Sequence, residues 1–155
     1  MAYTKTSWTN GSAPAINASN LNKIENGIYN NASVIDSLFF EAGDVFDYTY
    51  GGIMPCAGLV TTSGKDVFFT VTLPKRLDHV SSFTVDTLTG GMRGASGYVD
   101  GTSDSSNLKS SYTVTGLILD SNNIRIQMTK ASAMSNVTNN TPVAVSIRSI
   151  KLTFA

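Results

Sequence analysis

Asn17 to Leu38, which reads NASNLNKIENGIYNNASVIDSL, is the stretch that decides how the rest of the chain is organised. A set of its positions recurs at alternating steps of three and four residues, which is the a/d spacing of a coiled coil. We call these positions the seam: Leu21, Ile24, Ile28, Asn31, Ile35 and Leu38. The spacing predicts a helix with one narrow apolar stripe.

Both ends of this helix carry sequence signals. Asn17 is a good N-cap, because its side-chain oxygen can accept a hydrogen bond from a free backbone N–H of the first turn, and Asn20 is the competing candidate. The pattern runs to about Phe40. Gly43 follows shortly after, and glycine is common just past the last helical turn.

The predicted helix needs a partner. Gly27 costs about 1 kcal/mol relative to alanine, and an isolated helix of this length is marginal in water. The partner is either the same helix of other subunits or the β region of the same chain. The sustained 3.5-residue period and the polar Asn31 favour other subunits, because a helix that packs on its own domain usually has a broader apolar stripe. The mixture of Leu and Ile leaves two, three and four strands open.

After Gly43 the chain consists of short β-forming runs separated by Gly, Ser, Asn and Asp. The first run alternates, which places Phe46, Tyr48 and Tyr50 on one face of a strand. The next two runs predict a hairpin around a turn at 63–66.

Further runs, with a short turn at 121–123, have the spacing of an antiparallel β-sandwich of the jelly-roll-like kind. The sequence therefore predicts a mainly β protein with an extended arm at 1–16, a coiled-coil helical stalk at 17–42 and a β-sandwich head at 43–155.

Composition and charge narrow the possible partners. Eleven basic residues balance eleven acidic ones, so the electrostatic footprint of a nucleic-acid binder is missing. The sequence has no signal-peptide pattern and no run of about 18 apolar residues, so we expect a soluble cytoplasmic product without membrane insertion. The single cysteine, Cys56, rules out an intrachain disulfide and is predicted to be a small buried apolar side chain.

The sequence gives weak support to catalysis. His79 is the only histidine, and no nucleophile or metal motif surrounds it, so no catalytic residue, metal or cofactor is predicted. Two nominal carboxylate pairs remain as candidates for glycosidic-bond hydrolysis. They are Asp100 with Asp104, and Asp44 with Asp47.

Between Thr89 and Ser111 the sequence turns irregular and rich in Gly, Ser and Asp. Long loops on a β frame often carry binding functions. The residues able to stack on or hydrogen-bond a polar ligand are Arg93, Tyr98, Asp100 and Asp104. A solvated loop without a ligand is the alternative.

Trp8 stands alone in a polar arm that contains Asn10-Gly11 and Pro14. A single exposed aromatic residue is a good anchor at an interface, which makes Trp8 a candidate for attachment to a larger particle. The alternative is that Trp8 folds back on the start of its own helix.

Two segments carry a resemblance to a known class of proteins. The arm and helix, YTKTSWTNGSAPAINASNLNKIENGI, resemble the N-terminal segment of many tail-fibre and related appendage proteins of phages and prophages of Gram-positive bacteria. The core of this likeness is Asn17 to Glu25. The head resembles C-terminal domains of such proteins in 64–70 and in the closing AMSNVTNNTPVAVSIRSIKLTF.

This resemblance implies a non-enzymatic virion protein, made in the bacterial host cytoplasm. It implies an N-terminal part that joins other virion proteins, a homotrimer through three parallel helices, and a β head that meets the host surface. We expect that the head recognises a host surface glycan. The alternatives are a capsid fibre or baseplate component without a ligand, and a glycan-cleaving appendage.

Overall fold

The computed structural model describes residues 17–49, 54–61 and 63–155. The chain divides after Leu38 into two compact units, residues 1–38 and 39–155. Trp8 and Tyr50 lie outside the described residues.

The helix α1 spans Ala18–Leu38. Its N-cap is Asn17, because the Asn17 Oδ1 atom accepts a hydrogen bond of 2.9 Å from the backbone N–H of Asn20. The backbone carbonyl of Asn17 also accepts the first helical bond, 3.0 Å from the N–H of Leu21. The first of the two predicted caps is therefore confirmed.

The helix ends at Leu38, two residues before the predicted end. The cause lies in the next two residues. Phe39 forms a bridge with Arg76, and the N–H of Phe40 donates to the Arg76 carbonyl at 2.8 Å. The Phe40 ring is buried and stacks on Phe154 with 4.3 Å between ring centroids. Because Phe39 and Phe40 make these contacts within the head, the two residues do not continue the helix.

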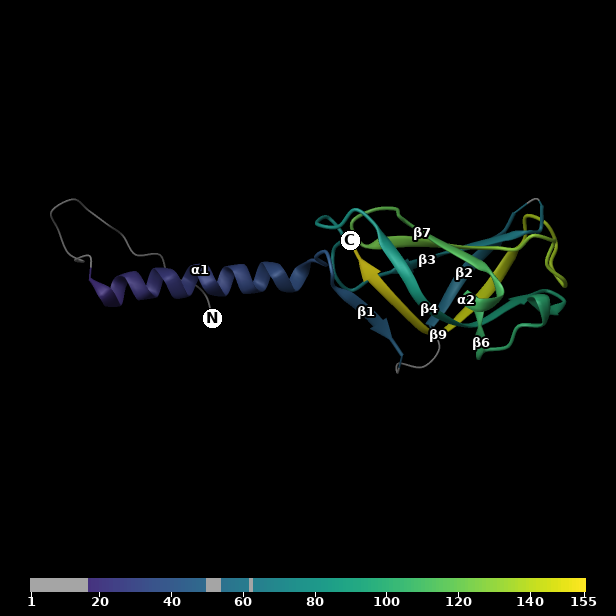
Figure 1. Cartoon of the computed structure of the whole chain (residues 1–155), viewed down its shortest axis with the longest axis horizontal. Helices are drawn as coiled ribbons and strands as arrows, with labels where there is room; N and C mark the ends of the chain where they lie inside the picture. Colours follow the sequence, from purple (N-terminus) through teal and green to yellow (C-terminus); the bar gives the residue numbers. More distant parts are fainter. Residues whose placement is uncertain (1–16, 50–53, 62) are drawn as a thin grey trace. The chain divides into compact units, whose positions relative to one another are not determined.

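The head is built from β strands and two short helical segments (Figure 1). The strands are β1 (Val45–Tyr48), β2 (Met54–Val60), β3 (Asp66–Thr72), β4 (Phe83–Gly94), β5 (Gly97–Tyr98), β6 (Ser106–Asn107), β7 (Thr113–Ile118), β8 (Asn123–Thr129) and β9 (Pro142–Phe154). The helical segments are the 3-10 turn η1 (Val99–Gly101) and the helix α2 (Leu108–Ser111).

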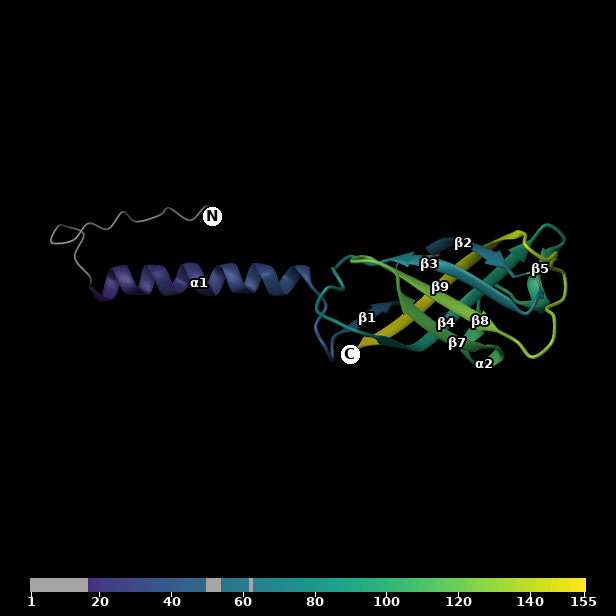
Figure 2. The ribbon, with the colours of Figure 1, turned by 90° about the horizontal axis from the view of Figure 1, so that it is seen from above.

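All nine described strands belong to one antiparallel sheet, in the order β5-β4-β9-β2-β3-β8-β7, with β1 on β9 and β6 on β4. The chain is mainly β, as predicted. The two separate sheets of a sandwich are not confirmed, because the strands form a single sheet that curls around a common interior (Figure 2). The curl brings β7 against β4, although the two strands stand near opposite ends of the order.

The last strand, β9, joins most of the sheet together. Its residues Pro142–Ile147 pair with β2, its residues Ile150–Thr153 pair with β1, and β4 runs along its other side. Inward residues are spaced by two up to Ile147 and resume at Ile150, because a bulge lies between them.

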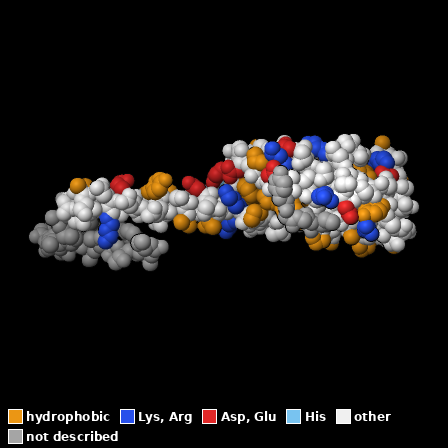
Figure 3. All heavy atoms as spheres, turned by 90° about the horizontal axis from the view of Figure 1, so that it is seen from below, with side chains coloured by type: hydrophobic (Ala, Val, Ile, Leu, Met, Phe, Trp, Pro, Cys, Tyr) orange, Lys and Arg blue, Asp and Glu red, His pale blue; other side chains and the backbone are white. Residues whose placement is uncertain are grey.

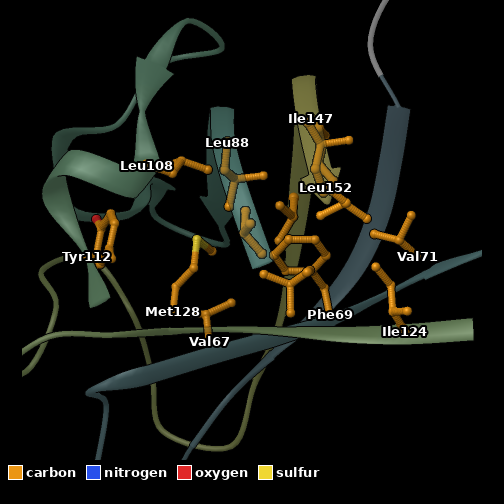
Figure 4. Close-up of a cluster of buried hydrophobic side chains, with 14 of the residues drawn as sticks. Val67, Phe69, Val71, Leu88, Leu108, Tyr112, Ile124, Met128, Ile147 and Leu152 are labelled. Carbon is orange, nitrogen blue, oxygen red and sulfur yellow. The ribbon is translucent and has the colours of Figure 1, made fainter. Parts of the chain in front are cut away.

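The curled sheet encloses one hydrophobic core (Figure 4). Side chains from β3, β4, β8 and β9 point into it, among them Val67, Phe69, Val71, Leu88, Ile124, Met128, Ile147 and Leu152. Leu108 and Tyr112 close the core from the side of α2. The alternation of buried and exposed residues along these strands is what a sheet with one covered face requires.

The two short turns that the sequence predicts in the head, at 63–66 and at 121–123, are confirmed. The hairpin β2–β3 forms, with Leu59 opposite Phe68. The turn between β7 and β8 is held by Asp120, whose Oδ1 accepts hydrogen bonds from the N–H groups of Asn122 and Asn123, each at 2.9 Å.

Cys56 is half-buried against the core, and its burial raises the pKa of the thiol to about 11.

Candidate functional site

The apolar stripe of α1 has no cover within the described residues. No residue of this helix is buried. The exposed fractions of seam side chains are 49% for Leu21, 59% for Ile28, 50% for Ile35 and 52% for Leu38. Apolar side chains accordingly appear at intervals on the surface of α1 (Figure 3). Such a stripe costs free energy in water, since burying each of these side chains would stabilise the helix by about 1.5–3 kcal/mol.

Phe39 and Glu41 follow α1 closely and form a second feature with three residues from the segment between β3 and β4. We call this feature the collar: Phe39, Glu41, Arg76, Asp78 and His79. The Phe39 ring stacks on the His79 ring with 4.1 Å between centroids, and the Arg76 guanidinium lies 5.5 Å from the Phe39 centroid. Glu41 Oε1 lies 2.5 Å from His79 Nδ1, and Arg76 Nε donates to Asp78 at 2.8 Å. The only histidine therefore packs in a structural cluster at the entry to the head.

Arg93 and Tyr98, two of the predicted ligand-binding residues, lie together. They face each other in the β4–β5 hairpin, and the Arg93 guanidinium lies 4.1 Å from the Tyr98 ring centroid. Arg93 Nη2 also donates a hydrogen bond to the Tyr98 hydroxyl. Arg93 is exposed and Tyr98 half-buried, so the pair forms a small cationic and aromatic surface.

The Asp100 carboxylate is engaged by the chain itself. It accepts a hydrogen bond of 3.0 Å from the Tyr112 hydroxyl, one from Lys130 Nζ, and a longer one of 3.4 Å from the Ser135 N–H. Burial acts to raise the pKa of Asp100, but the bonds from Lys130 and Tyr112 outweigh it and hold the pKa below its usual value. Asp100 thus braces three segments, and its role toward a ligand stays a prediction.

Asp104 lies apart from these partners. The loop that contains Asp104 packs closely against β4. A β-carbon added to Gly91 would lie 2.8 Å from the Ser103 carbonyl and 3.1 Å from the Asp104 backbone nitrogen. Among the described residues, no hydrogen bond or ion pair joins the Asp104 side chain to Arg93, Tyr98 or Asp100. The structure therefore brings together one pair of the four predicted residues.

A feature that the sequence did not single out is a groove between β4, β6 and α2. Its volume is about 220 Å³. We call it the β4–α2 groove. The residues that line it are all of polar or charged type: Asp86, Thr87, Thr89, Asn107, Lys109 and Ser110.

A β-bulge places Asp86 in this groove. Val85 pairs with Leu152 and Thr87 with Lys151, which leaves Asp86 as the extra residue of β4. The spacing of the buried residues Phe83, Val85 and Leu88, first two and then three, is the sequence signal that predicts such a bulge.

Hydrogen bonds fix the charged groups of the groove. The Thr153 hydroxyl donates to Asp86 Oδ2 at 2.6 Å and the Thr84 hydroxyl to Oδ1 at 3.2 Å. The bond from Thr153 is the main reason why the pKa of Asp86 lies below its usual value. Lys109 Nζ donates to the backbone carbonyl of Val85. Both charged groups are therefore held in place by hydrogen bonds within the chain itself.

No group of three or more His, Cys, Asp or Glu side chains suited to a metal ion occurs in the described part of the chain. Within the same residues, no helix has the length and apolar character needed to cross a membrane. Comparisons with protein-family models, with curated proteins and with solved structures gave no match.

Proposed function

We propose that the chain is a non-enzymatic attachment protein of a phage particle. Three copies associate in parallel through a coiled coil of α1, the N-terminal arm joins other virion proteins, and the β head contacts a glycan of the host surface. The observation that carries this proposal is the uncovered seam of α1, in which apolar side chains at a/d spacing remain about half exposed.

The energetics of α1 support association. Burying the aliphatic seam residues against sister helices would contribute about 1.5–3 kcal/mol for each side chain, before the entropy of association is subtracted. Gly27 and the several Asn residues of the helix oppose its formation in isolation. The seam therefore needs partner helices, and Asn31 within it would align their register.

The sequence likeness to phage appendage proteins supports the assignment to a virion, and the polar loops and groove of the head support a glycan as the ligand. Three heads on one stalk would bind a repetitive surface polymer with an avidity that no single head reaches. A capsid fibre or baseplate component without a ligand is the second candidate. It is favoured by Asp100, whose carboxylate braces its own loop.

The trimer is tested by light scattering of the full chain. The chain mass is 16.4 kDa, and we expect a particle of three times that mass at micromolar concentration. A monomer under these conditions would refute the association through α1.

The attachment function is tested by sedimentation of the full chain with isolated cell walls of Gram-positive bacteria. Walls are used before and after periodate treatment, which cleaves the vicinal diols of sugars. We expect binding that periodate abolishes. Binding that survives periodate points to a protein receptor, and release of new reducing ends from the wall would identify a glycan-cleaving protein instead.

A further inference from the structure

We infer that the β4–α2 groove is a binding subsite for one neutral hexopyranose unit, held by hydrogen bonds from its hydroxyls to Asp86, Asn107 and Lys109. The inference rests on the proposed function in taking a glycan as the ligand, and it names the place on the head where one sugar unit of that glycan lies.

The groove is assembled from separate parts of the chain. Asp86, Thr87 and Thr89 come from β4, Asn107 from β6, and Lys109 and Ser110 from α2. Asn107 Oδ1 accepts the N–H of Ser110 at 3.1 Å, which fixes the amide group at the start of α2. Together with the bonds to Asp86 and Lys109 described above, this gives a preorganised wall, and preorganisation lowers the cost of binding.

The remaining hydrogen-bonding capacity suits hydroxyl groups. An ionised carboxylate has about four acceptor sites, and Asp86 uses two of them on Thr153 and Thr84. An ammonium group has three donors, of which Lys109 gives one to Val85. The groove thus offers acceptors and donors side by side. Sugar hydroxyls, which donate and accept at once, match such a mixture.

The charge and size of the groove narrow the ligand class. The lining residues contribute one carboxylate and one ammonium group, so the lining itself carries no net charge and favours neither an anionic nor a cationic ligand. The lining has no aromatic or large aliphatic side chain, which argues against an apolar ligand. The volume of about 220 Å³ lies below the roughly 300–1,000 Å³ of pockets that enclose a drug-sized molecule, so the groove holds one ring of a longer chain.

The test is an NMR titration of the ¹⁵N-labelled full chain with methyl glycosides of glucose, galactose, mannose and rhamnose, with glucuronate as the charged comparison. We expect at least one neutral glycoside to shift the amide signals of 86–89 and 107–110 in a saturable way, and glucuronate to leave them unchanged. The inference is overturned if no neutral glycoside shifts these signals, or if glucuronate shifts them as strongly.

Two variants locate the site. Thr87→Trp fills the groove from an exposed position of β4, so it should abolish the shifts while leaving the spectrum of the core intact. Asp86→Asn removes the charge at nearly constant shape and should weaken binding about tenfold, because hydrogen bonds to a charged group are the stronger ones. Asp36→Asn, which removes a carboxylate of α1 that belongs neither to the groove nor to the seam, serves as the matched control. Saturable shifts that persist in Thr87→Trp would refute the subsite.

The same variants separate this inference from the proposed function. If Thr87→Trp still binds cell walls in a periodate-sensitive way, the head is a glycan binder and the groove is not its site. If the wild-type chain does not sediment with cell walls, but methyl glycosides shift the groove signals in a saturable way, the subsite is confirmed and attachment to the host is refuted.

Discussion

Phe83 lies so close to Gly116 that a β-carbon added to Gly116 would stand 2.3 Å from the Phe83 ring. Phe83 belongs to β4 and Gly116 to β7, two strands that do not pair with each other. Their contact marks the place where the curled sheet meets itself. A glycine is needed there, because any side chain would push the ring away from the core.

Gly116→Ala should therefore destabilise the head. Gly116 itself is exposed, but the added carbon would press on the buried Phe83 ring, so we expect the free energy of unfolding to fall by about 1–3 kcal/mol, the usual cost of overpacking. Thr115→Ala, at the neighbouring exposed position, should change it by less than about 0.5 kcal/mol. Chemical denaturation of both variants measures the difference. In the background of Phe83→Leu the cost of Gly116→Ala should shrink, and strict additivity would show that the two residues are not coupled.

Charges placed in the seam should dissociate the trimer. Ile28→Asp combined with Ile35→Asp puts six carboxylates into the interior of three parallel helices, where unpaired charges are strongly unfavourable. We expect light scattering to report a monomer while the circular dichroism of the β head is retained. Asn26→Asp combined with Ser33→Asp adds the same charge with the same spacing on the opposite side of the helix. That control should keep the mass of the wild type, and a monomer in both pairs would show that charge alone, not the seam, is responsible.

Asp100 should make the stability of the head depend on pH. Its pKa is lower in the folded chain than the value of about 3.9 that an aspartate has when unfolded. A carboxyl of this kind stabilises the folded state above the unfolded pKa, and the contribution is lost as the pH falls through the folded pKa. The melting temperature should hence decrease from about pH 5 to about pH 2.

Asp100→Asn is the informative variant, because asparagine also tolerates the left-handed backbone that Asp100 adopts, with φ at 55°. We expect it to lower the free energy of unfolding at neutral pH by about 1–3 kcal/mol and to flatten the decline toward low pH. Asp104→Asn should leave the pH profile unchanged. An equal decline in the Asp100→Asn variant and the wild type would assign the acid sensitivity to other carboxyls, such as Asp86.

Cys56 should react slowly with iodoacetamide in the folded chain. The thiolate is the reactive form, and a pKa of about 11 leaves it rare at pH 8. Compared with the unfolded chain, whose thiol has a pKa of about 8.5, alkylation should be roughly a hundredfold slower. Mass spectrometry of timed samples gives both rates, with Cys56→Ser as the unreactive control. Equal rates would contradict the raised pKa.

The features that the sequence predicts correctly depend on neighbours along the chain. Asn17 caps α1 through a contact three residues away, and the turn around Asp120 is built within four residues. The half-buried Phe46 and Tyr48 alternate with exposed residues in β1, as the period of two requires.

The features that the sequence missed depend on distant partners. The early end of α1 follows from the contact of Phe40 with Arg76 and Phe154, which lie far along the chain. The single curled sheet follows from the pairing of β9 with β1, β2 and β4, which no local pattern encodes. Asp86 and Lys109 become neighbours only after a bulge and the fold of α2 over β4.

The pairing pattern of β9 has a consequence for biosynthesis. Every other described strand of the head precedes β9 in the chain, and β1, β2 and β4 all pair with β9. The ribosome therefore synthesises α1 and the described strands β1 to β8 before it synthesises β9, and the sheet cannot close until then. A chain truncated before Pro142 lacks β9 and leaves strand edges unpaired, and unpaired strand edges are prone to aggregation. The head can therefore complete its sheet only after β9 has been translated.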